Sequence, residues 1–425
     1  MIVSPRPNTR LVAVEVRVRD AGSAHESPAE NGLAHAVEHL VFKGGDAPGV
    51  FDARFERMGG EVVAQTSRDA TAYRVTVLPE HAVAAINLLG EMLMRPRFRD
   101  ADWNAERTVI GREMRVAQSD ARKQGLQCVA TGTHTTGDAL AQPIMGSPAN
   151  LARFTAADLQ AFHAAHYTPA NLVVAVCGAV DADTVTKAVE TAFAPPTAPP
   201  QVTPASIVPL PEVAPASTIQ PVQIQRELAT LYIGFGGMSR LSDPANAVAA
   251  DVLAAFLVRG GDGGAGVLGA KVSGNVALET VSLGADYLPG VSASAFVMFA
   301  TSDKRTVGKV EDALVAELSA LALRLADGDT ATLADELSAA KAAAIGEAKY
   351  RRETVDGEAQ YLAYLATLNA PDDYADKYAE RVRAVTFADL LRILNRAVTP
   401  AKRVSVVVGL DTIAEPIVRR AETTP

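Results

Sequence analysis

Two periodicities of apolar and polar residues run along the chain. Alternating patterns in "LVAVEVRVRD" (residues 11–20) and "ATAYRVTVL" (residues 70–78) predict β-strands. Between residues 33 and 41, Leu33, Val37, Leu40 and Val41 recur at helical spacing, which predicts a helix ended by the glycines at 44–45. Strand patterns and long alanine-rich helical patterns do not alternate regularly. The sequence therefore predicts an α+β fold and not a doubly wound parallel sheet.

An internal repeat divides the chain. The stretches "FTAADLQAFHAAHYTPANLVVAVCGAV" and "VTFADLLRILNRAVTPAKRVSVVVGLD" align without a gap, at a constant separation of 231 residues, as between Thr155 and Thr386. In each copy, Thr and Asp mark a helix start, and Thr-Pro ends that helix before a β-branched strand. Two copies indicate a domain duplication and not a solenoid.

A proline-dense stretch, "FAPPTAPPQVTPASIVPLPEVAPAS", separates the copies. Such a composition is typical of an extended, semi-rigid linker. We therefore predict an N-terminal domain at residues 1–194, a linker at 195–221 and a homologous C-terminal domain at 222–425. The second half contains no histidine, so a histidine-based metal site would belong to the first half alone.

Three polar residues interrupt the apolar helix predicted within "NGLAHAVEHLVFKGG". His35 and His39 stand one turn apart on the same face, with Glu38 beside them. An isolated histidine pair at this spacing is more often accidental than functional, but a glutamate on an apolar helix needs a partner or a metal. The order H-x-x-E-H is the inverse of the H-E-x-x-H zinc-protease motif. The stretch thus predicts a zinc site.

Composition excludes several other classes of protein. Hydrophobic residues make up 48% of the 425-residue chain and charged residues 21%, as in folded soluble proteins. The formal net charge of −9, without a basic run, argues against a nucleic-acid surface. No apolar stretch is long enough to span a membrane. Cys128 and Cys177 lack metal-binding or redox spacing.

The chain resembles the pitrilysin and mitochondrial processing peptidase family of zinc metallopeptidases, the inverzincins. The resemblance covers most of the chain and rests on "GLAHAVEHLVFKG", "GGEVVAQTSRDATAYRV", "ERTVIGRE", "QPIMGSPANLARFTAADLQAFHAAHYTPANLVVAVCG" and the duplication. It implies two homologous domains, each a mostly antiparallel sheet packed with helices. It also implies a chamber that admits only unfolded peptides or small proteins.

The resemblance assigns the site residues. It implies that His35, His39 and Glu113 bind one Zn²⁺ per chain, and that Glu38 is the catalytic base. It makes Glu106 a residue that orients a ligand histidine. Such a site would hydrolyse peptide bonds, because zinc acidifies a bound water whose proton a free carboxylate can take.

Family members hold the substrate as an added strand on a sheet edge. The matching residues here are Val63, Ala64, Gln65 and Thr66, within "VVAQTSRDATAYRV". Where the family commonly has asparagine before this alanine, the chain has Val63. A polar contact to the substrate is therefore missing or is supplied elsewhere.

A second departure concerns the C-terminal half. Family members or their partner subunits carry an Arg/Tyr pair that binds substrate, whereas "GVLGAKVSGNVALETVSLGADYLPG" has no arginine and only Tyr287. The resemblance thus implies a heterodimer with a second family subunit that supplies the pair, with a homodimer as the alternative.

Two rival functions share these residues. The chain could be a non-catalytic binding or scaffold subunit, which the missing Arg/Tyr pair favours and the intact Glu38 disfavours. It could also be a biosynthetic peptidase that removes leader peptides. The sequence leaves open a periplasmic location, with the leader removed, or a cytoplasmic one for a soluble bacterial-type protein. It does not name the substrate.

Overall fold

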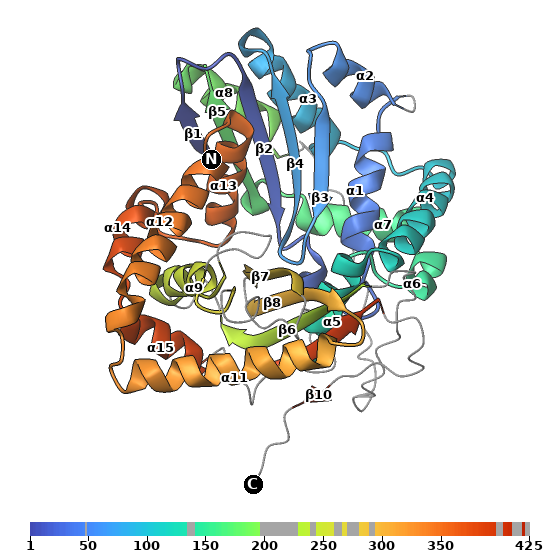
Figure 1. Ribbon diagram of the computed structural model, residues 1–425. Helices are drawn as coiled ribbons and strands as arrows, with labels where there is room; N and C mark the ends of the chain where they lie inside the picture. Colours follow the sequence, from blue (N-terminus) through green and yellow to red (C-terminus); the bar gives the residue numbers. More distant parts are fainter. Residues whose placement is uncertain are drawn as a thin grey trace. The chain divides into compact units, whose positions relative to one another are not determined.

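The computed structural model describes residues 1–46, 49–133, 141–195, 228–238, 244–258, 266–269, 280–288, 294–396, 403–409 and 419–420. The predicted linker at 195–221 lies outside these residues except for its first position. The α+β prediction is confirmed, because two mixed units each combine one five-stranded sheet with helices (Figure 1). No helix in the described part of the chain is long and apolar enough to cross a membrane.

The first unit is built on one mainly antiparallel sheet. Its strands, in spatial order, are β1 (Ile2–Pro5), β5 (Leu172–Gly178), β2 (Val12–Arg19), β4 (Ala70–Val77) and β3 (Val62–Thr66). Only the β1–β5 pair is parallel. Its helices are α1 (Leu33–Lys43), α2 (Val50–Glu56), α3 (Ala82–Met94), most of α4 (Asp100–Gln118), α6 (Pro148–Arg153), α7 (Ala156–His166), α8 (Ala182–Ala192) and α13 (Val355–Thr367).

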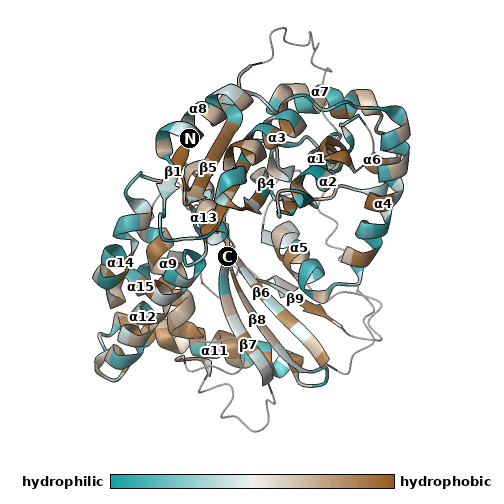
Figure 2. Cartoon of the chain, turned by 90° about the horizontal axis from the view of Figure 1, so that it is seen from above, coloured by the Kyte–Doolittle hydropathy of each residue, from teal (hydrophilic) through white to brown (hydrophobic). Residues whose placement is uncertain are grey.

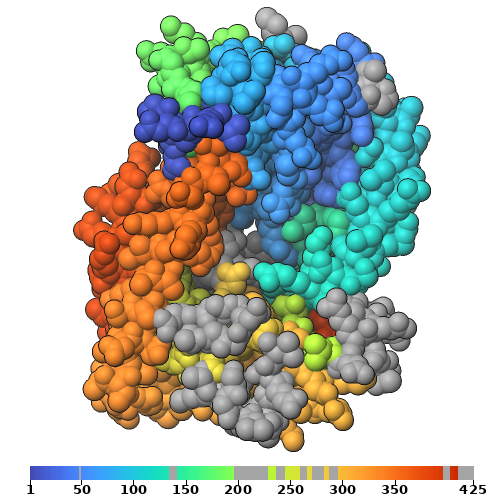
Figure 3. Space-filling model, turned by 45° about the horizontal axis from the view of Figure 1, so that its top comes forward, coloured from blue at the N-terminus to red at the C-terminus, as the bar shows by residue number. Residues whose placement is uncertain are grey.

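Both faces of the first sheet are covered. Val12, Val14, Val16 and Val18 of β2 are fully buried in the core that α1, α3 and α7 also supply. The opposite face packs against α13, where Ala359 and other small residues meet β5. Burial on both faces explains why β5 is apolar along its whole length (Figure 2). In Figure 3 the orange segment that includes α13 lies against the dark blue first residues of the chain.

The second unit repeats this plan. Its strands, in spatial order, are β10 (Arg419–Arg420), β9 (Arg403–Val408), β6 (Leu228–Met238), β8 (Ser294–Asp303) and β7 (Thr280–Leu288). Every pairing described in this sheet is antiparallel. Its helices are α5 (Ala121–Thr133), α9 (Pro244–Leu257), α11 (Val307–Ala326), most of α12 (Ala334–Arg351), α14 (Tyr374–Ala384) and α15 (Phe387–Arg396).

The repeat seen in the sequence is reproduced in atomic detail. The Thr155 hydroxyl donates to Asp158 at 2.7 Å at the start of α7, and the Thr386 hydroxyl donates to Asp389 at 2.7 Å at the start of α15. The strands that follow, β5 and β9, run into Gly178 and Gly409, which have φ values of 137° and 103°. Glycine is needed at both positions because other residues rarely adopt such φ values.

The compact units are not contiguous in sequence. Helix α13, from the second half of the chain, belongs to the unit that contains the first sheet. Helix α5, from the first half, packs on β6 and β9 of the second sheet, where Gly125 lies directly against Tyr232. The predicted division into 1–194 and 222–425 follows the repeat, whereas the compact units exchange one helix across it.

Candidate metal and catalytic site

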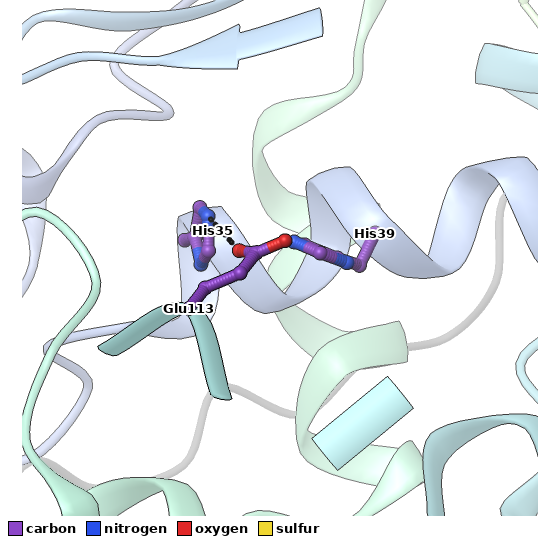
Figure 4. Close-up of side chains that lie close together, drawn as sticks. All are labelled: His35, His39 and Glu113. Atoms are coloured by element: carbon purple, nitrogen blue, oxygen red, sulfur yellow. Dashed lines mark ion pairs between the residues drawn. The ribbon is translucent and has the colours of Figure 1, made fainter. Parts of the chain in front are cut away.

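Two helices of the first unit bring the candidate metal ligands together. His35 and His39 project from α1, and the carboxylate of Glu113, from α4, lies between the two imidazole rings (Figure 4). Glu113 Oε2 lies 3.6 Å from His35 Nε2 and 3.3 Å from His39 Nε2. Among the described residues, these three form the group whose ligand atoms lie close enough to share an ion, within 4.8 Å of one another.

These distances fit a zinc ion. Zinc–nitrogen and zinc–oxygen bonds of about 2.1 Å in a tetrahedron place neighbouring ligand atoms roughly 3.4 Å apart. The two glutamate–histidine separations are close to that length. Two imidazoles and one carboxylate also leave the fourth position open, as in catalytic zinc sites.

Glu106 fixes the orientation of His39. His39 Nδ1 donates to Glu106 Oε2 at 3.0 Å, which leaves Nε2 on the side of Glu113. Lys43 Nζ lies 3.4 Å from Glu106 Oε1. The hydrogen bond from His39 is the main cause of a lowered Glu106 pKa. Burial opposes the charged form of His39, but Glu106, Glu113 and Glu38 together raise the His39 pKa above its ordinary value.

Glu38 is close to the ligands but makes different contacts. Its Oε2 accepts a hydrogen bond from the Thr66 hydroxyl at 2.5 Å. Burial raises the Glu38 pKa, and the bonds from Thr66 oppose that rise. A buried carboxyl group with a raised pKa, outside the ligand group, is suited to accept and return a proton.

Strand β3 carries the residues predicted to contact substrate. It is the edge strand of the first sheet, paired with β4 alone among the described strands. Val63 is 48% exposed and Gln65 is also exposed, whereas Ala64 is half-buried and the Thr66 side chain faces the interior.

The remaining histidines of α7 serve packing. His163 is buried, stacks on Tyr167, and its Nε2 lies 2.8 Å from the carbonyl oxygen of Leu93. Burial lowers its pKa to about 4. Trp103 of α4 is likewise buried, and its indole N–H donates to the carbonyl of Phe154 at 2.8 Å.

Sequence reasoning missed Glu26, which holds the start of α1. Its carboxylate accepts bonds from the backbone N–H groups of Gly32 at 2.9 Å and Ala34 at 2.6 Å, and from the Asn31 side chain at 3.0 Å. A carboxylate at this end of a helix satisfies amides that have no partner within the helix. Glu26 lies six residues before the cap, beyond the spacing of local capping motifs, so no sequence pattern identifies it.

The same helix start is clamped by the segment around "QPIMGSPAN". The Asn31 side chain donates to the carbonyl of Pro143, and the Asn150 side chain donates to the carbonyl of Asn31. Gly32 and Gly146 both have positive φ, and a Cβ on either would lie within 3 Å of the backbone of the other segment. These contacts fix the angle at which α1 enters the site.

Glu26 yields a testable pH dependence. Burial raises its pKa from 4.5 to about 7, so between these values the folded protein binds this proton more tightly than the unfolded chain. The stabilisation from Glu26 is therefore complete below about pH 4.5 and is lost as the pH rises to 7. The free energy of unfolding of the native chain, minus that of Glu26→Gln, should fall by about 3 kcal/mol from pH 4.5 to 8. Urea unfolding of both chains in a chelator measures it. If this difference in the free energy of unfolding grew with pH instead, the three hydrogen-bond donors would stabilise the charged form of Glu26 more than burial destabilises it.

Two family models match the chain. Residues 1–147 match "Insulinase (Peptidase family M16)" and residues 153–330 match "Peptidase M16 inactive domain". A probable mitochondrial-processing peptidase subunit beta of Arabidopsis thaliana is 29% identical over 75% of this chain and 60% of its own length. An uncharacterized zinc protease, YmxG, of Bacillus subtilis is 32% identical over 45% of this chain and 47% of its own length. The aligned part of this chain thus spans about half the length of these relatives.

A solved structure extends the likeness to the whole fold. A protease from Helicobacter pylori superimposes with a TM-score of 0.78, covers 96% of both chains and is 19% identical in sequence. At that identity the superposition establishes the fold alone.

Proposed function

Because this chain belongs to the M16 family of peptidases, we propose that it is a zinc-dependent metallopeptidase subunit that hydrolyses unfolded peptides or small proteins. The observation that carries the proposal is the group of His35, His39 and Glu113, at separations that suit one zinc ion, with the buried Glu38 close by but outside the ligand group. All four residues belong to the predicted catalytic domain, 1–194. We assign residues 222–425 to a homologous non-catalytic domain.

Each side chain has a distinct task in this proposal. His35, His39 and Glu113 hold the ion, and Glu106 keeps His39 in the tautomer whose Nε2 can bind it. A bound zinc would supply a Lewis acid that polarises the scissile carbonyl and acidifies the attacking water. Glu38 takes the proton of that water and returns it to the nitrogen of the leaving amine. Burial of Glu38 favours this cycle, because it brings the pKa of the carboxyl group nearer to neutrality.

The exposed edge of β3 supports a peptide substrate. An extended peptide can pair with the free backbone groups of an edge strand, and such pairing gives affinity with little sequence selectivity. Val63, Ala64 and Gln65 would line this strand, with the exposed side chains of Val63 and Gln65 nearest to solvent. Val63 offers an apolar contact where the family's asparagine would offer a polar one.

A scaffold role is the second candidate. The match of residues 153–330 to an inactive domain favours it, as does the absence of an arginine from residues 266–290. Residues 270–279 and the Tyr287 side chain lie outside the described structure. The intact Glu38 favours the peptidase, because a purely structural zinc site needs no free carboxylate base.

We further propose that a second family subunit supplies the missing Arg/Tyr pair, since a similar protein is named as the beta subunit of a processing peptidase. The test measures hydrolysis of a quenched-fluorescent peptide library by the zinc-loaded chain, first alone and then with a family subunit that carries the pair. We expect cleavage to rise at least 100-fold with the partner, because groups that stabilise the transition state contribute roughly this much. Equal activity without a partner would favour a self-sufficient monomer or homodimer. A chain that binds zinc but cleaves nothing in either setting is a scaffold.

A further inference from the structure

The contact between Thr66 and Glu38 departs from the role that the sequence predicts for Thr66. On β3, Val62, Val63, Ala64 and Gln65 are exposed or half-buried, whereas Thr66 is buried. Its hydroxyl lies 2.5 Å from Glu38 Oε2, within hydrogen-bonding distance. The side chain at the end of the edge strand is thus committed to the interior, while its neighbours remain at the surface.

A second threonine, Thr71, contacts Thr66 and restricts its hydroxyl group. Thr71 lies directly opposite Thr66 in the pairing of β3 with β4, and the two Oγ1 atoms are 3.1 Å apart. The Thr71 hydroxyl donates to the carbonyl oxygen of Ala21 at 2.6 Å. A carbonyl only accepts, so the single hydroxyl hydrogen of Thr71 is committed there. The hydrogen of Thr66 therefore turns to Glu38, the nearer and more strongly accepting of its neighbours.

The surroundings give this arrangement little freedom. Thr71 is completely buried and also forms a side-chain hydrogen bond with Tyr167, whose hydroxyl lies 2.6 Å from that of Tyr73. The turn between the strands is closed by Ser67, whose hydroxyl donates to the carbonyl of Ala70 at 2.8 Å. The network therefore runs from Glu38 into the packed core.

We propose that Thr66, held in place by Thr71, is a positioning residue that fixes the Glu38 carboxyl group for proton transfer. The inference rests on the proposed peptidase function. The Thr66 hydroxyl and backbone N–H both bond to the Glu38 carboxylate, so the Thr66 hydroxyl is not available to a peptide on β3. Loss of the hydroxyl leaves Glu38 only the backbone hydrogen bond from Thr66, which loosens the carboxyl group, and small misplacements of a catalytic group cost up to about 100-fold in rate.

The test uses two pairs of side chains that differ by one hydroxyl, Thr against Val and Ser against Ala at position 66. Thr66→Val and Thr66→Ala should lower kcat by about 10- to 100-fold with KM changed less than about twofold, and Thr66→Ser should keep kcat within about threefold of the native chain. Zinc content should not change. A crystal structure of metal-free Thr66→Val should show Glu38 in more than one rotamer. If Thr66→Val does not fold, the Ser/Ala pair carries the test.

Thr301→Val is the matched control. Thr301 and Thr230 form another cross-strand threonine pair, between β8 and β6 of the second sheet, with their hydroxyl oxygens 3.0 Å apart, and the control should leave kcat unchanged. A raised KM with native kcat in Thr66→Val would make Thr66 a substrate contact and overturn the inference, as would unchanged kcat or lost zinc. In each of these outcomes the native chain still cleaves peptide. A native chain that is inert, with or without a partner, would instead remove the proposed function and this inference with it.

Discussion

Glu38→Gln should lower kcat/KM for peptide hydrolysis by about 10³- to 10⁴-fold while the chain keeps its zinc. Glutamine has nearly the shape of glutamate and can still contact the Thr66 hydroxyl, but it cannot take a proton from water. General acid–base catalysis contributes roughly 10²–10⁴-fold, and here one group serves both as base and as acid. Because Glu38 lies outside the ligand group, the ion should remain bound. Initial rates on a quenched-fluorescent peptide and metal analysis of the same samples measure both effects.

Glu91→Gln provides the control for this substitution. Glu91 lies on α3 of the same unit, is exposed and pairs with Arg54 at 2.8 Å, so the same chemical change there should leave activity within about twofold. Retention of native activity by Glu38→Gln would remove Glu38 from the mechanism. Loss of zinc from that variant would make Glu38 a ligand.

Replacement of Glu113 should have the second largest effect, on metal affinity itself. Apparent zinc affinities of about 10–16 kcal/mol, shared among three or four ligands, imply about 3–4 kcal/mol for each ligand, or a change in Kd of roughly 150- to 700-fold. Glu113→Gln should weaken zinc binding by this amount and abolish hydrolysis. Glu106→Gln, which loses only the acceptor for His39, should weaken binding by about 10- to 100-fold. Competition with a chromophoric chelator measures both.

The relative sizes of the losses in zinc affinity in Glu113→Gln and Glu106→Gln distinguish the roles of the two glutamates. Both residues lie on α4, two turns apart, and both contact His39, at 3.0 Å from Glu106 and 3.3 Å from Glu113. Equal losses in the two variants, or a larger loss for Glu106→Gln, would contradict the assignment of Glu113 as the ligand.

Local periodicity predicted the helix that carries His35, Glu38 and His39. The spacing of Leu33, Val37 and Leu40 predicts a helix over residues 33–41, and the structure has α1 at Leu33–Lys43. Glu106 and Glu113 are seven residues apart in the sequence, so on a helix they share one face, and both reach His39. Such predictions succeed because helix geometry alone relates residues that are close in sequence.

Contacts between distant segments could not be predicted in this way. The bond between Thr66 and Glu38 depends on where β3 lies against α1, and the cap formed by Glu26 depends on how the chain folds back before that helix. Alternation along β3 places Thr66 on the same face as Val62 and Ala64, but it does not name the partner. The assignment of substrate contacts to residues 63–66 stays a prediction.

Along the chain, α5 and α13 are separated by nearly the same number of residues as the two copies of the repeat. Each of the two helices packs on the sheet formed by the other copy. The arrangement is that of a domain-swapped dimer, in which two subunits exchange one equivalent element, except that here both halves belong to one covalent chain. A gene encoding either half alone would therefore yield a sheet with one apolar face bare and a helix with no place to bind. Two such halves made in one cell should rescue each other, whereas either made singly should aggregate.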